Sequence, residues 1–413
     1  MGREKKRILV IGINSLPELT GIGRYTGDMI TWLVDQGHEV TMITSFPYYP
    51  QWKVQSPYSG NFYKKEITND GKLTLYRCPM YVPAKPTGIK RLIHEASFFL
   101  SAFFVLIRLV FKQRFDLTVC IAPPFHLGFL ALTYRLFKRA PVVYHIQDLQ
   151  IDAAKELKML PDGIFSILFA FERFILRKVD LVSTISEGML EKVKIKTDNS
   201  LIFFPNWVST ELYFPLNDRH LLKTKWGFDK DDKVVLYSGS IGEKQGLDSL
   251  IRIAGQLKTQ SFIKFVICGT GPFKETLMKM AEAEGLRNVL FFPLQPNELF
   301  NEFLNVADVH LVLQKGDASD LVMPSKLTTI LSVGGLALVT ANPGTTLFEV
   351  IQEHQMGIVI KPEDEELLKS TILDCCTTDY AGKQGNARMY AERFLAKEEI
   401  MKDFESQLLE LKI

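Results

Sequence analysis

The chain lacks most features that mark metal, redox and nucleic-acid-binding proteins. Its five cysteines form no CxxC pair and no cluster with histidine at metal-ligand spacing. An odd number of scattered cysteines suits a reducing compartment. The 49 basic and 47 acidic side chains nearly cancel, so the basic excess of a dedicated nucleic-acid binder is missing. We therefore expect no metal, no cofactor and no nucleic-acid partner.

A targeting signal is also lacking. The basic N-terminus precedes an apolar run at residues 8–13, which is shorter than the core of a signal peptide and has no small-residue cleavage site. A first buried β-strand is the better interpretation of this run. We expect a cytoplasmic protein.

No apolar run is expected to cross a membrane. The longest extends from Phe98 to Phe111, follows Lys90-Arg91 and contains Arg108. It is too short and too charged for a span, which needs about 20 apolar residues. A buried helix explains it, and so does a helix lying on an anionic membrane surface, the interpretation we favour. Residues 164–178 form a second segment of this kind.

What the sequence does contain is a regular alternation of strand and helix patterns in two consecutive series. Such alternation predicts an α/β fold with two doubly wound, Rossmann-like parallel sheets. The predicted domains are residues 1–207 and 233–385, joined by a linker at 208–232. Helices at 386–413 are expected to pack back on the first domain. The expected strands are 8–14, 40–44, 117–122, 142–147, 181–185, 234–238, 262–268, 288–292, 309–313, 337–340 and 357–360.

Glycine-rich turns follow three of these strands. Glycines let a backbone approach a ligand, and a helix N-terminus favours phosphate. The first turn misses the dinucleotide fingerprint G-x-G-x-x-G because its next glycine is Gly27, and no acidic residue ends the second strand at Thr44-Ser45. Tight turns alone would also explain glycine, but three such loops favour a phosphate-bearing ligand. The expected contacts are Gly21, Ile22, Gly23, Arg24, Gly239, Ser240, Gly242, Lys244, Gln245, Gly269 and Gly271.

A lysine follows the strand expected at 309–313. Pro324, Ser325 and Lys326 lead into a helix that ends at Gly334-Gly335. Lys326 lies in the predicted first turn, where a cation opposes the helix dipole unless an anion is bound nearby. Ser325 and the first-turn amides could donate to the same phosphate. An exposed lysine on a solvated face is the alternative.

Together these residues resemble the retaining GT-B glycosyltransferases of family 4, over essentially the full chain. The nearest type is that of the colanic acid fucosyltransferases, which the likeness at residues 241–247 supports. The other matching segments are residues 17–25, 37–40, 46–50, 184–186, 205–207 and 324–327.

The resemblance implies a retaining transfer from a nucleoside-diphosphate sugar, with GDP-fucose the nearest choice and UDP sugars the alternatives, without a bound metal. The acceptor would be a lipid-linked saccharide of exopolysaccharide, capsule or O-antigen (lipopolysaccharide) biosynthesis. The first domain would hold the acceptor and the second the donor. The enzyme would be peripheral on the inner face of the cell membrane.

The family's basic pair and its paired glutamates are replaced in this chain. Ser240 and Gln245 stand where the family has Arg and Lys, so Lys326 and Lys244 are expected to supply the charge at the diphosphate. Leu321 and Thr329 occupy the glutamate positions, with Asp320 beside the first. Further expected substrate contacts are Asp320, Pro324, Ser325, Thr329 and Glu349, although capping explains Glu349 equally well.

His145 matches a family histidine that is thought to touch the donor sugar. Asp148 would orient the acceptor hydroxyl or take its proton. A satisfied core histidine is an equal alternative for His145. No carboxylate pair for a double displacement is evident.

Two rival functions remain open. A nucleotide-sugar epimerase of similar architecture would turn over the donor without an acceptor. A non-enzymatic nucleotide-sugar-binding protein would explain the lost basic pair.

Overall fold

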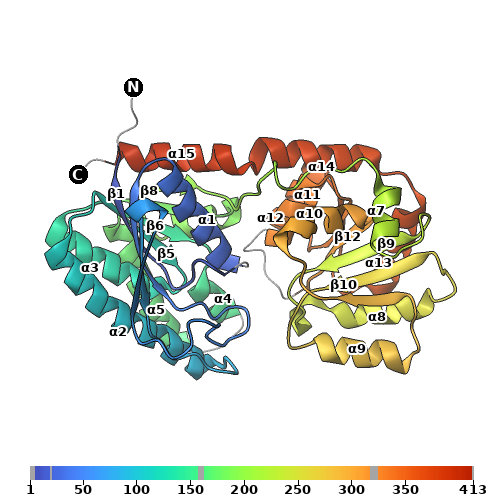
Figure 1. The fold of residues 1–413 in the computed structure, drawn as a ribbon, viewed down its shortest axis with the longest axis horizontal. Coiled ribbons are helices and arrows are strands. Elements are labelled where there is room, and N and C mark those ends of the chain that lie inside the picture. The colour runs from blue at the N-terminus through green and yellow to red at the C-terminus, as the bar shows by residue number, and fades with distance from the viewer. Residues whose placement is uncertain (1–4, 19–20, 157–161, 317–323, 412–413) are drawn as a thin grey trace. The chain divides into compact units, whose positions relative to one another are not determined.

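The computed structural model describes residues 5–18, 21–156, 162–316 and 324–411. Its backbone divides into two compact units (Figure 1). Unit 1 comprises Met1–Pro205 and Glu399–Ile413, and unit 2 comprises Asn206–Glu398. Each unit is a largely parallel sheet covered by helices, which confirms the predicted α/β class and the two Rossmann-like folds.

The sheet of unit 1 has eight strands in the order β3-β4-β2-β1-β5-β6-β7-β8. Ile8 on β1 is paired with Val40 on one side and Leu117 on the other, so the apolar N-terminal run becomes the central strand. All pairs are parallel except β3 with β4. The strands are β1 (Arg7–Ile11), β2 (Glu39–Ser45), β3 (Lys64–Thr68), β4 (Leu73–Cys78), β5 (Leu117–Ala122), β6 (Val142–Ile146), β7 (Leu181–Thr184) and β8 (Ser200–Phe203).

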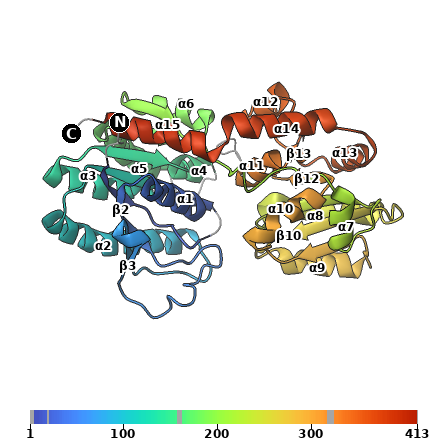
Figure 2. The ribbon, with the colours of Figure 1, turned by 45° about the horizontal axis from the view of Figure 1, so that its top comes forward.

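Three helices of unit 1, α2, α3 and α5, lie next to one another (Figure 1). The C-terminal helix α15 lies across the same unit (Figure 2), where the ring of Phe404 stacks on Phe204 with centroids 3.8 Å apart. The helices are α1 (Gly21–Asp35), α2 (Gly88–Lys112), α3 (Gly128–Lys138), α4 (Gln150–Glu156), α5 (Asp162–Lys178), α6 (Glu187–Lys194) and α15 (Lys397–Glu410).

The helix α2 corrects one expectation. It has 25 residues, and among the helices that the structure describes it alone is long and apolar enough to cross a membrane, by length and composition, with a hydropathy of 1.7. The segment considered in the sequence analysis was shorter than α2 because it included only the aromatic run. One face of α2 packs against β2, β4 and α3 and buries Glu95, Phe98 and Leu106. In this fold α2 is therefore part of the core of unit 1.

The sheet of unit 2 has six strands in the order β11-β10-β9-β12-β13-β14, all parallel. Separate apolar cores lie on its two faces. The strands are β9 (Lys233–Ser238), β10 (Ile263–Cys268), β11 (Val289–Phe292), β12 (Val309–Val312), β13 (Ala337–Thr340) and β14 (Ile358–Ile360). The helices are α7 (Arg219–Lys225), α8 (Leu247–Gln256), α9 (Lys274–Ala283), α10 (Asn297–Val306), α11 (Ser325–Ser332), α12 (Thr346–Glu353), α13 (Glu365–Thr377) and α14 (Ala381–Phe394).

The predicted linker and C-terminal segment differ from the structure. Residues 208–232 belong to unit 2, because Val208 and Tyr213 are buried in its core and α7 forms within this stretch. Arg388 on α14 donates to the carbonyl oxygens of Tyr213 (2.9 Å) and Ser332 (2.6 Å). Thus α14 packs in unit 2, and the last helix, from Glu399 onward, belongs to unit 1.

Candidate functional site

The side chain of Lys326 turns toward the end of β9. Lys326 is the second residue of α11, as the sequence predicts, and its Nζ lies 3.7 Å from the centroid of the Tyr237 ring. A Cβ atom on Gly239 would come within 3.0 Å of the same Nζ. Desolvation lowers the pKa of Lys326 to about 7, and among the described residues no carboxylate is paired with its ammonium. This partly buried cation is thus placed beside the first glycine loop of unit 2.

The two glycine loops of unit 2 pack backbone to backbone. Gly239 has a φ of 148° and Gly269 a φ of 149°, which is the region that favours glycine. A Cβ on Gly269 would lie 1.9 Å from the carbonyl oxygen of Gly239, and one on Gly271 would lie 2.1 Å from that of Ile241. The N–H of Ile241 donates to the carbonyl of Thr270 at 2.9 Å. Loop packing therefore explains Gly269 and Gly271 without a ligand, unlike the sequence interpretation.

The polar residues of the first loop have local roles as well. Gln245 Oε1 accepts the N–H of Gly242 at 3.0 Å, and the Ser240 carbonyl accepts from the Tyr237 hydroxyl at 2.6 Å. Lys244 is exposed, and its carbonyl accepts the N–H of Lys315 at 3.0 Å. Gln245 thus stabilises the loop rather than presenting a charge.

A cavity of about 290 Å³ adjoins this loop. It lies at the carboxyl ends of β12, β13 and β14, between α8 and α13. Its lining includes Gln245, Lys315 and Lys361, and four carboxylates as well, so its charges are mixed. Lys326 and Gly239 are not in the lining, so this cavity is distinct from the Lys326 position.

The remaining predicted residues of α11 and α12 take structural positions. Pro324 precedes α11, and Ser325 is exposed at its first residue. The hydroxyl of the buried Thr329 donates to the Lys326 carbonyl at 2.9 Å, and Glu349 Oε1 accepts the N–H of Gly344 at 3.2 Å. The capping alternative for Glu349 is therefore the one that the contacts support. The expected contact Asp320 lies outside the described residues, as does Leu321.

In unit 1, His145 does not face the end of its strand. It is 1% exposed, its Nδ1 lies 2.9 Å from the Ser183 hydroxyl, and its ring lies 5.0 Å from that of Phe204. Burial lowers the pKa of His145 to about 3. The core alternative for His145 is the one that these contacts support. Asp148 is only partly buried, between β6 and α4.

The glycine turn before α1 depends on a residue that the sequence analysis did not single out. Glu18 Oε1 accepts the N–H groups of Tyr48 (3.0 Å) and Tyr49 (2.9 Å), and its Oε2 accepts from Asn14 Nδ2 (2.9 Å). A Cβ on Gly23 would lie 2.4 Å from Oε2. Glu18 therefore joins the turn to the loop after β2. The position of Glu18 next to a glycine turn is the sequence feature from which its role could have been predicted.

Of the other residues predicted at this turn, Gly21 has a φ of 59° and begins α1. Ile22 is partly buried, and the Arg24 guanidinium lies 5.7 Å from the Tyr25 ring. The turn thus has the predicted position at the carboxyl end of β1.

A second group that was missed lies at the same edge of the sheet. The rings of Tyr48 and His94 are 4.8 Å apart, and Trp52 lies 5.3 Å from His94. Gln150 Nε2 donates to both carboxylate oxygens of the buried Glu95, at 2.8 and 2.9 Å. The sequence analysis identified residues 46–50 only as a family motif, because the sequence pattern does not indicate that they contact α2.

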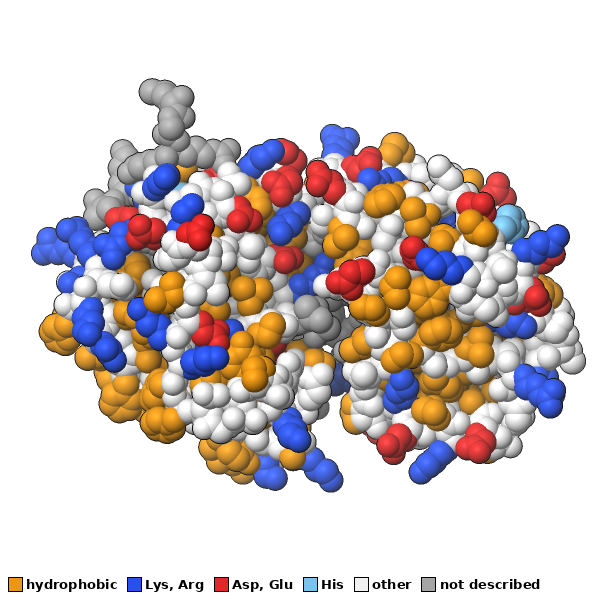
Figure 3. All heavy atoms as spheres, viewed as in Figure 1, with side chains coloured by type: hydrophobic (Ala, Val, Ile, Leu, Met, Phe, Trp, Pro, Cys, Tyr) orange, Lys and Arg blue, Asp and Glu red, His pale blue; other side chains and the backbone are white. Residues whose placement is uncertain are grey.

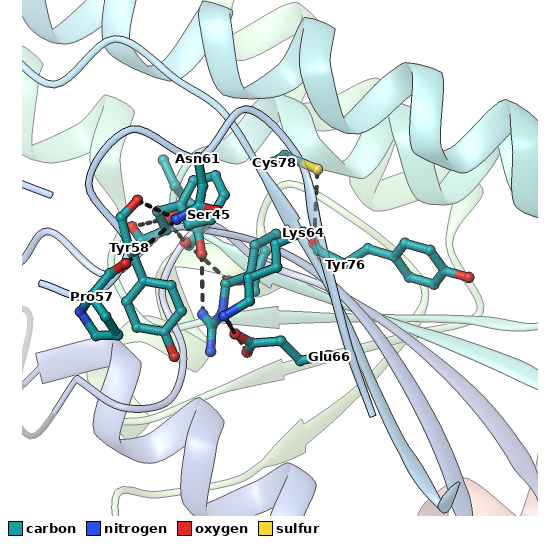
Figure 4. A network of polar contacts seen from close by, with 12 residues as sticks. Ser45, Pro57, Tyr58, Asn61, Lys64, Glu66, Tyr76 and Cys78 are labelled. Carbon is teal, nitrogen blue, oxygen red and sulfur yellow. Dashed lines mark hydrogen bonds and ion pairs between the residues drawn. The ribbon is translucent and has the colours of Figure 1, made fainter. Parts of the chain in front are cut away.

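A polar network holds the loop between β2 and β3 (Figure 4). Arg77 Nε donates to Glu66 Oε2 at 2.7 Å, and its guanidinium lies 4.7 Å from the centroid of the Tyr58 ring. Lys64 lies 3.0 Å from Glu66 Oε1. Burial raises the pKa of Glu66, but the bonds and charges of Lys64 and Arg77 lower it below 4.5 overall. The loop is therefore anchored at its C-terminal end.

Within the described part of the chain no group of three or more His, Cys, Asp or Glu residues is arranged to hold a metal ion.

Comparison with known proteins agrees with this architecture. Residues 20–196 match the model of the glycosyl transferase 4-like domain, and residues 218–391 match that of glycosyl transferases group 1. A relative from Escherichia coli strain K12, named "Putative colanic acid biosynthesis glycosyl transferase WcaI", is 42% identical over 96% of this chain and 98% of its own.

Two solved structures share the fold. Sucrose-phosphate synthase from Thermosynechococcus elongatus has a TM-score of 0.75 at 15% identity, covering 98% of both chains. An Anabaena protein in complex with UDP and glucose has a TM-score of 0.69 at 13% identity, covering 98% of this chain and 100% of its own. The chain therefore belongs to the GT-B glycosyltransferases of family 4, with the colanic acid type as its near relative, and is a glycosyltransferase rather than an epimerase or a non-enzymatic binding protein.

Proposed function

We propose that this enzyme transfers a sugar, with retention, from a nucleoside-diphosphate sugar to a lipid-linked saccharide during synthesis of a colanic-acid-like surface polysaccharide. The polysaccharide assignment is supported by the 42% identical relative. GDP-fucose is the donor to test first, as in the family type that the sequence resembles. UDP sugars come next, because the Anabaena neighbour was solved with UDP and glucose.

The observation that supports the donor site is the Lys326 ammonium beside Gly239. A desolvated cation is stabilised by an incoming anion, and no described carboxylate is paired with Lys326. The growing negative charge of a diphosphate leaving group needs such stabilisation in the transition state. Lys326 is the second residue of α11, and the first-turn N–H groups of a helix are donors that suit a phosphate. In this proposal Lys326 replaces the basic pair lost at Ser240 and Gln245.

The acceptor is proposed to reach unit 1 along a membrane. The adjacent helices α2, α3 and α5 expose large apolar side chains, among them Phe104 (67% exposed) and Phe111 (81%). Arg108 and Lys112 lie among them on α2. Figure 3 shows hydrophobic and basic side chains interspersed over α2 and α3. Apolar side chains that insert at the headgroup level, with cations beside anionic lipid, suit a peripheral attachment on the inner membrane face. We call this surface the basic aromatic face.

A thermal-shift panel tests the donor proposal. The wild-type chain and Lys326→Met are incubated with GDP, UDP, GDP-fucose, UDP-glucose and UDP-N-acetylglucosamine, because a ligand of the native state raises the melting temperature. One diphosphate series should shift the wild type, and the variant should bind about 10- to 100-fold more weakly, as for loss of a charged hydrogen bond. Lys279→Ala, an exposed lysine on α9, is the matched control. A wild type with no shift, or an unaffected Lys326→Met, contradicts the proposal.

A further inference from the structure

We propose that Tyr48, Trp52 and His94, together with Arg91 and Glu95, bind the saccharide ring of the acceptor. We call these five residues the aromatic-histidine cluster. The proposal rests on the proposed function, because it takes the acceptor to be a saccharide, and it adds where that saccharide is recognised.

The cluster lies where ligands of a parallel sheet are expected. The loops after β1, β2, β5 and β6 meet there, because the carboxyl ends of these neighbouring strands share one edge. Asn14, from the loop after β1, is hydrogen-bonded to the Tyr48 side chain. Gln150, after β6, bonds to Glu95 and also accepts the N–H of Phe125 at 3.3 Å. Four loops and the start of α2 thus form one continuous polar and aromatic group.

Of the three rings of the cluster, Trp52 is the most exposed, since Tyr48 (5% exposed) and His94 (2%) are buried. Tyr48 and Trp52 lie edge to face with ring centroids 5.5 Å apart, and both contact the His94 ring. Trp52 is only half-buried, so part of its indole faces solvent. A partly exposed aromatic ring such as that of Trp52 packs against the apolar C–H face of a sugar ring, and a few placed polar groups fix the orientation of the sugar.

The backbone at Trp52 is strained. Its φ is 51°, in the left-handed region where a bulky residue is an outlier. Such strain persists only where the surroundings hold it, and it is concentrated at binding sites. Here Glu18 binds the start of the loop through Tyr48 and Tyr49, and Arg77 binds its far end through Tyr58. The loop is thus held in place before any ligand arrives.

His94 gives support for a ligand that is independent of the strained backbone at Trp52. It is 2% exposed, and its Nδ1–H donates to the Tyr81 carbonyl at 2.6 Å. Burial lowers the pKa of His94, so the ring is neutral near pH 7 and Nε2 is a bare acceptor. Within the part of the chain that the structure describes, this buried Nε2 has no hydrogen-bond partner. A buried acceptor without a donor is costly, and a ligand hydroxyl is the group that would satisfy it.

The polar rim favours a sugar over a lipid chain or a second nucleotide. The Glu95 carboxylate keeps acceptor capacity beyond its bonds from Gln150, and Arg91 lies 3.4 Å from it with a half-exposed side chain. The ring of His126 contacts the Glu95 backbone, and its buried Nε2 is likewise without a partner among the described residues. Acceptors and one cation around aromatic rings suit a ligand with many hydroxyl groups.

Saturation-transfer NMR on the full chain tests this directly, because it reports binding without catalysis. The probes are the methyl glycosides of fucose, glucose, galactose and N-acetylglucosamine. The variants are Trp52→Ala, Trp52→Phe and His94→Asn. Asparagine keeps a donor to the Tyr81 carbonyl but removes Nε2. Phe62→Ala is the matched control, since this aromatic residue of the same loop is 75% exposed and outside the cluster. Thermal shift with GDP and UDP monitors the donor side of every variant.

We expect at least one glycoside to bind the wild type, and Trp52→Ala and His94→Asn to weaken it at least about fivefold, as for loss of aromatic stacking or of one hydrogen bond. Trp52→Phe should retain part of the affinity, and Phe62→Ala all of it, with nucleotide shifts unchanged throughout. The proposal is overturned if no glycoside binds the wild type, if both variants bind normally, or if nucleotide shifts are lost in parallel. A wild type without any nucleotide shift contradicts the proposed function instead, whatever the glycosides do.

Discussion

The ammonium of Lys326 lies 3.7 Å from the centroid of the Tyr237 ring, where β9 ends and the first glycine loop of unit 2 begins. The ring stabilises a cation that is otherwise desolvated. Because the pKa of Lys326 is lowered to about 7, a large share of the free protein carries a neutral amine at physiological pH. This relationship makes a measurable prediction about donor binding.

Nucleotide binding is expected to take up a proton. A bound diphosphate stabilises the ammonium, which raises the pKa of Lys326 above 7. Calorimetric titrations at pH 8 in buffers of different ionisation enthalpy should therefore show uptake of up to about one proton per nucleotide. Affinity should fall as the pH rises from 7 toward the pKa of the bound form. Lys326→Met should abolish both effects, and an unchanged proton uptake in this variant would rule out Lys326 as the titrating group.

Gly269→Ala should disrupt the paired glycine loops. Its Cβ would meet the Gly239 carbonyl at 1.9 Å, and its φ of 149° disfavours a side chain. We expect a loss of at least about 2 kcal/mol in the unfolding free energy of unit 2, and a loss of nucleotide binding. Gly382→Ala on α14, where no atom lies within 4 Å of the added Cβ, should instead be neutral or stabilise by up to about 1 kcal/mol. Urea denaturation of both variants measures these differences, and equal effects would refute the loop-packing explanation.

Glu18 gives a prediction with a defined pH dependence. Burial raises its pKa above 4.5, although the bonds from Tyr48 and Tyr49 oppose this. A carboxyl with a raised pKa contributes stability below about pH 4.5 that is lost as the pH rises through its folded-state pKa. Glu18→Gln has no such titration. The difference in melting temperature between the variant and the wild type (variant minus wild type) should therefore increase as the pH rises from about 4.5 through the folded-state pKa of Glu18. A difference that does not change between pH 4 and 8 would be inconsistent with a buried, titrating Glu18.

The pair His38–Glu405 attaches α15 to unit 1. The N–H of Lys6 donates to His38 Nδ1 at 3.1 Å, so Nε2–H donates to Glu405 Oε1 at 2.9 Å. Removal of one partner of a buried pair typically costs about 3–5 kcal/mol, so His38→Ala should weaken the attachment strongly. Glu405→Gln can still accept the bond and should cost about 1 kcal/mol. Hydrogen exchange of α15 measures both, with the exposed Glu399→Ala as control. Similar exchange in His38→Ala and the control would contradict this role.

Membrane attachment should depend on the basic aromatic face. The double variant Phe104→Glu and Phe111→Glu should sediment with phosphatidylglycerol-containing vesicles at least about tenfold less than wild type, because two inserted apolar groups are lost. Leu221→Glu on α7, 66% exposed in unit 2, is the matched control. Binding of the wild type should weaken at 0.5 M salt, since screening shortens the reach of its cations. Failure of the wild type to sediment at low salt would disprove the attachment.

The sequence alone was sufficient for the two-domain architecture. Strands such as Leu117–Ala122 are apolar along most of their length because helices cover both faces of the sheet. Such strands can therefore be predicted from the sequence pattern alone. The strands that sequence analysis missed are β3, β4 and β8. The strand Lys64–Thr68 is largely exposed and charged, because an edge strand buries little, and this leaves no apolar pattern to detect.

Some features of the candidate site could likewise be predicted from the sequence, and others could not. The position of Lys326 at the start of α11 follows from local helix signals, which act over a few residues of the chain. Its approach to Tyr237, the burial of His145 against Phe204, and the meeting of Trp52 with His94 join residues far apart in the chain. Only the packing of strands and helices decides such contacts, because the direction of a side chain depends on which neighbours fill the space around it.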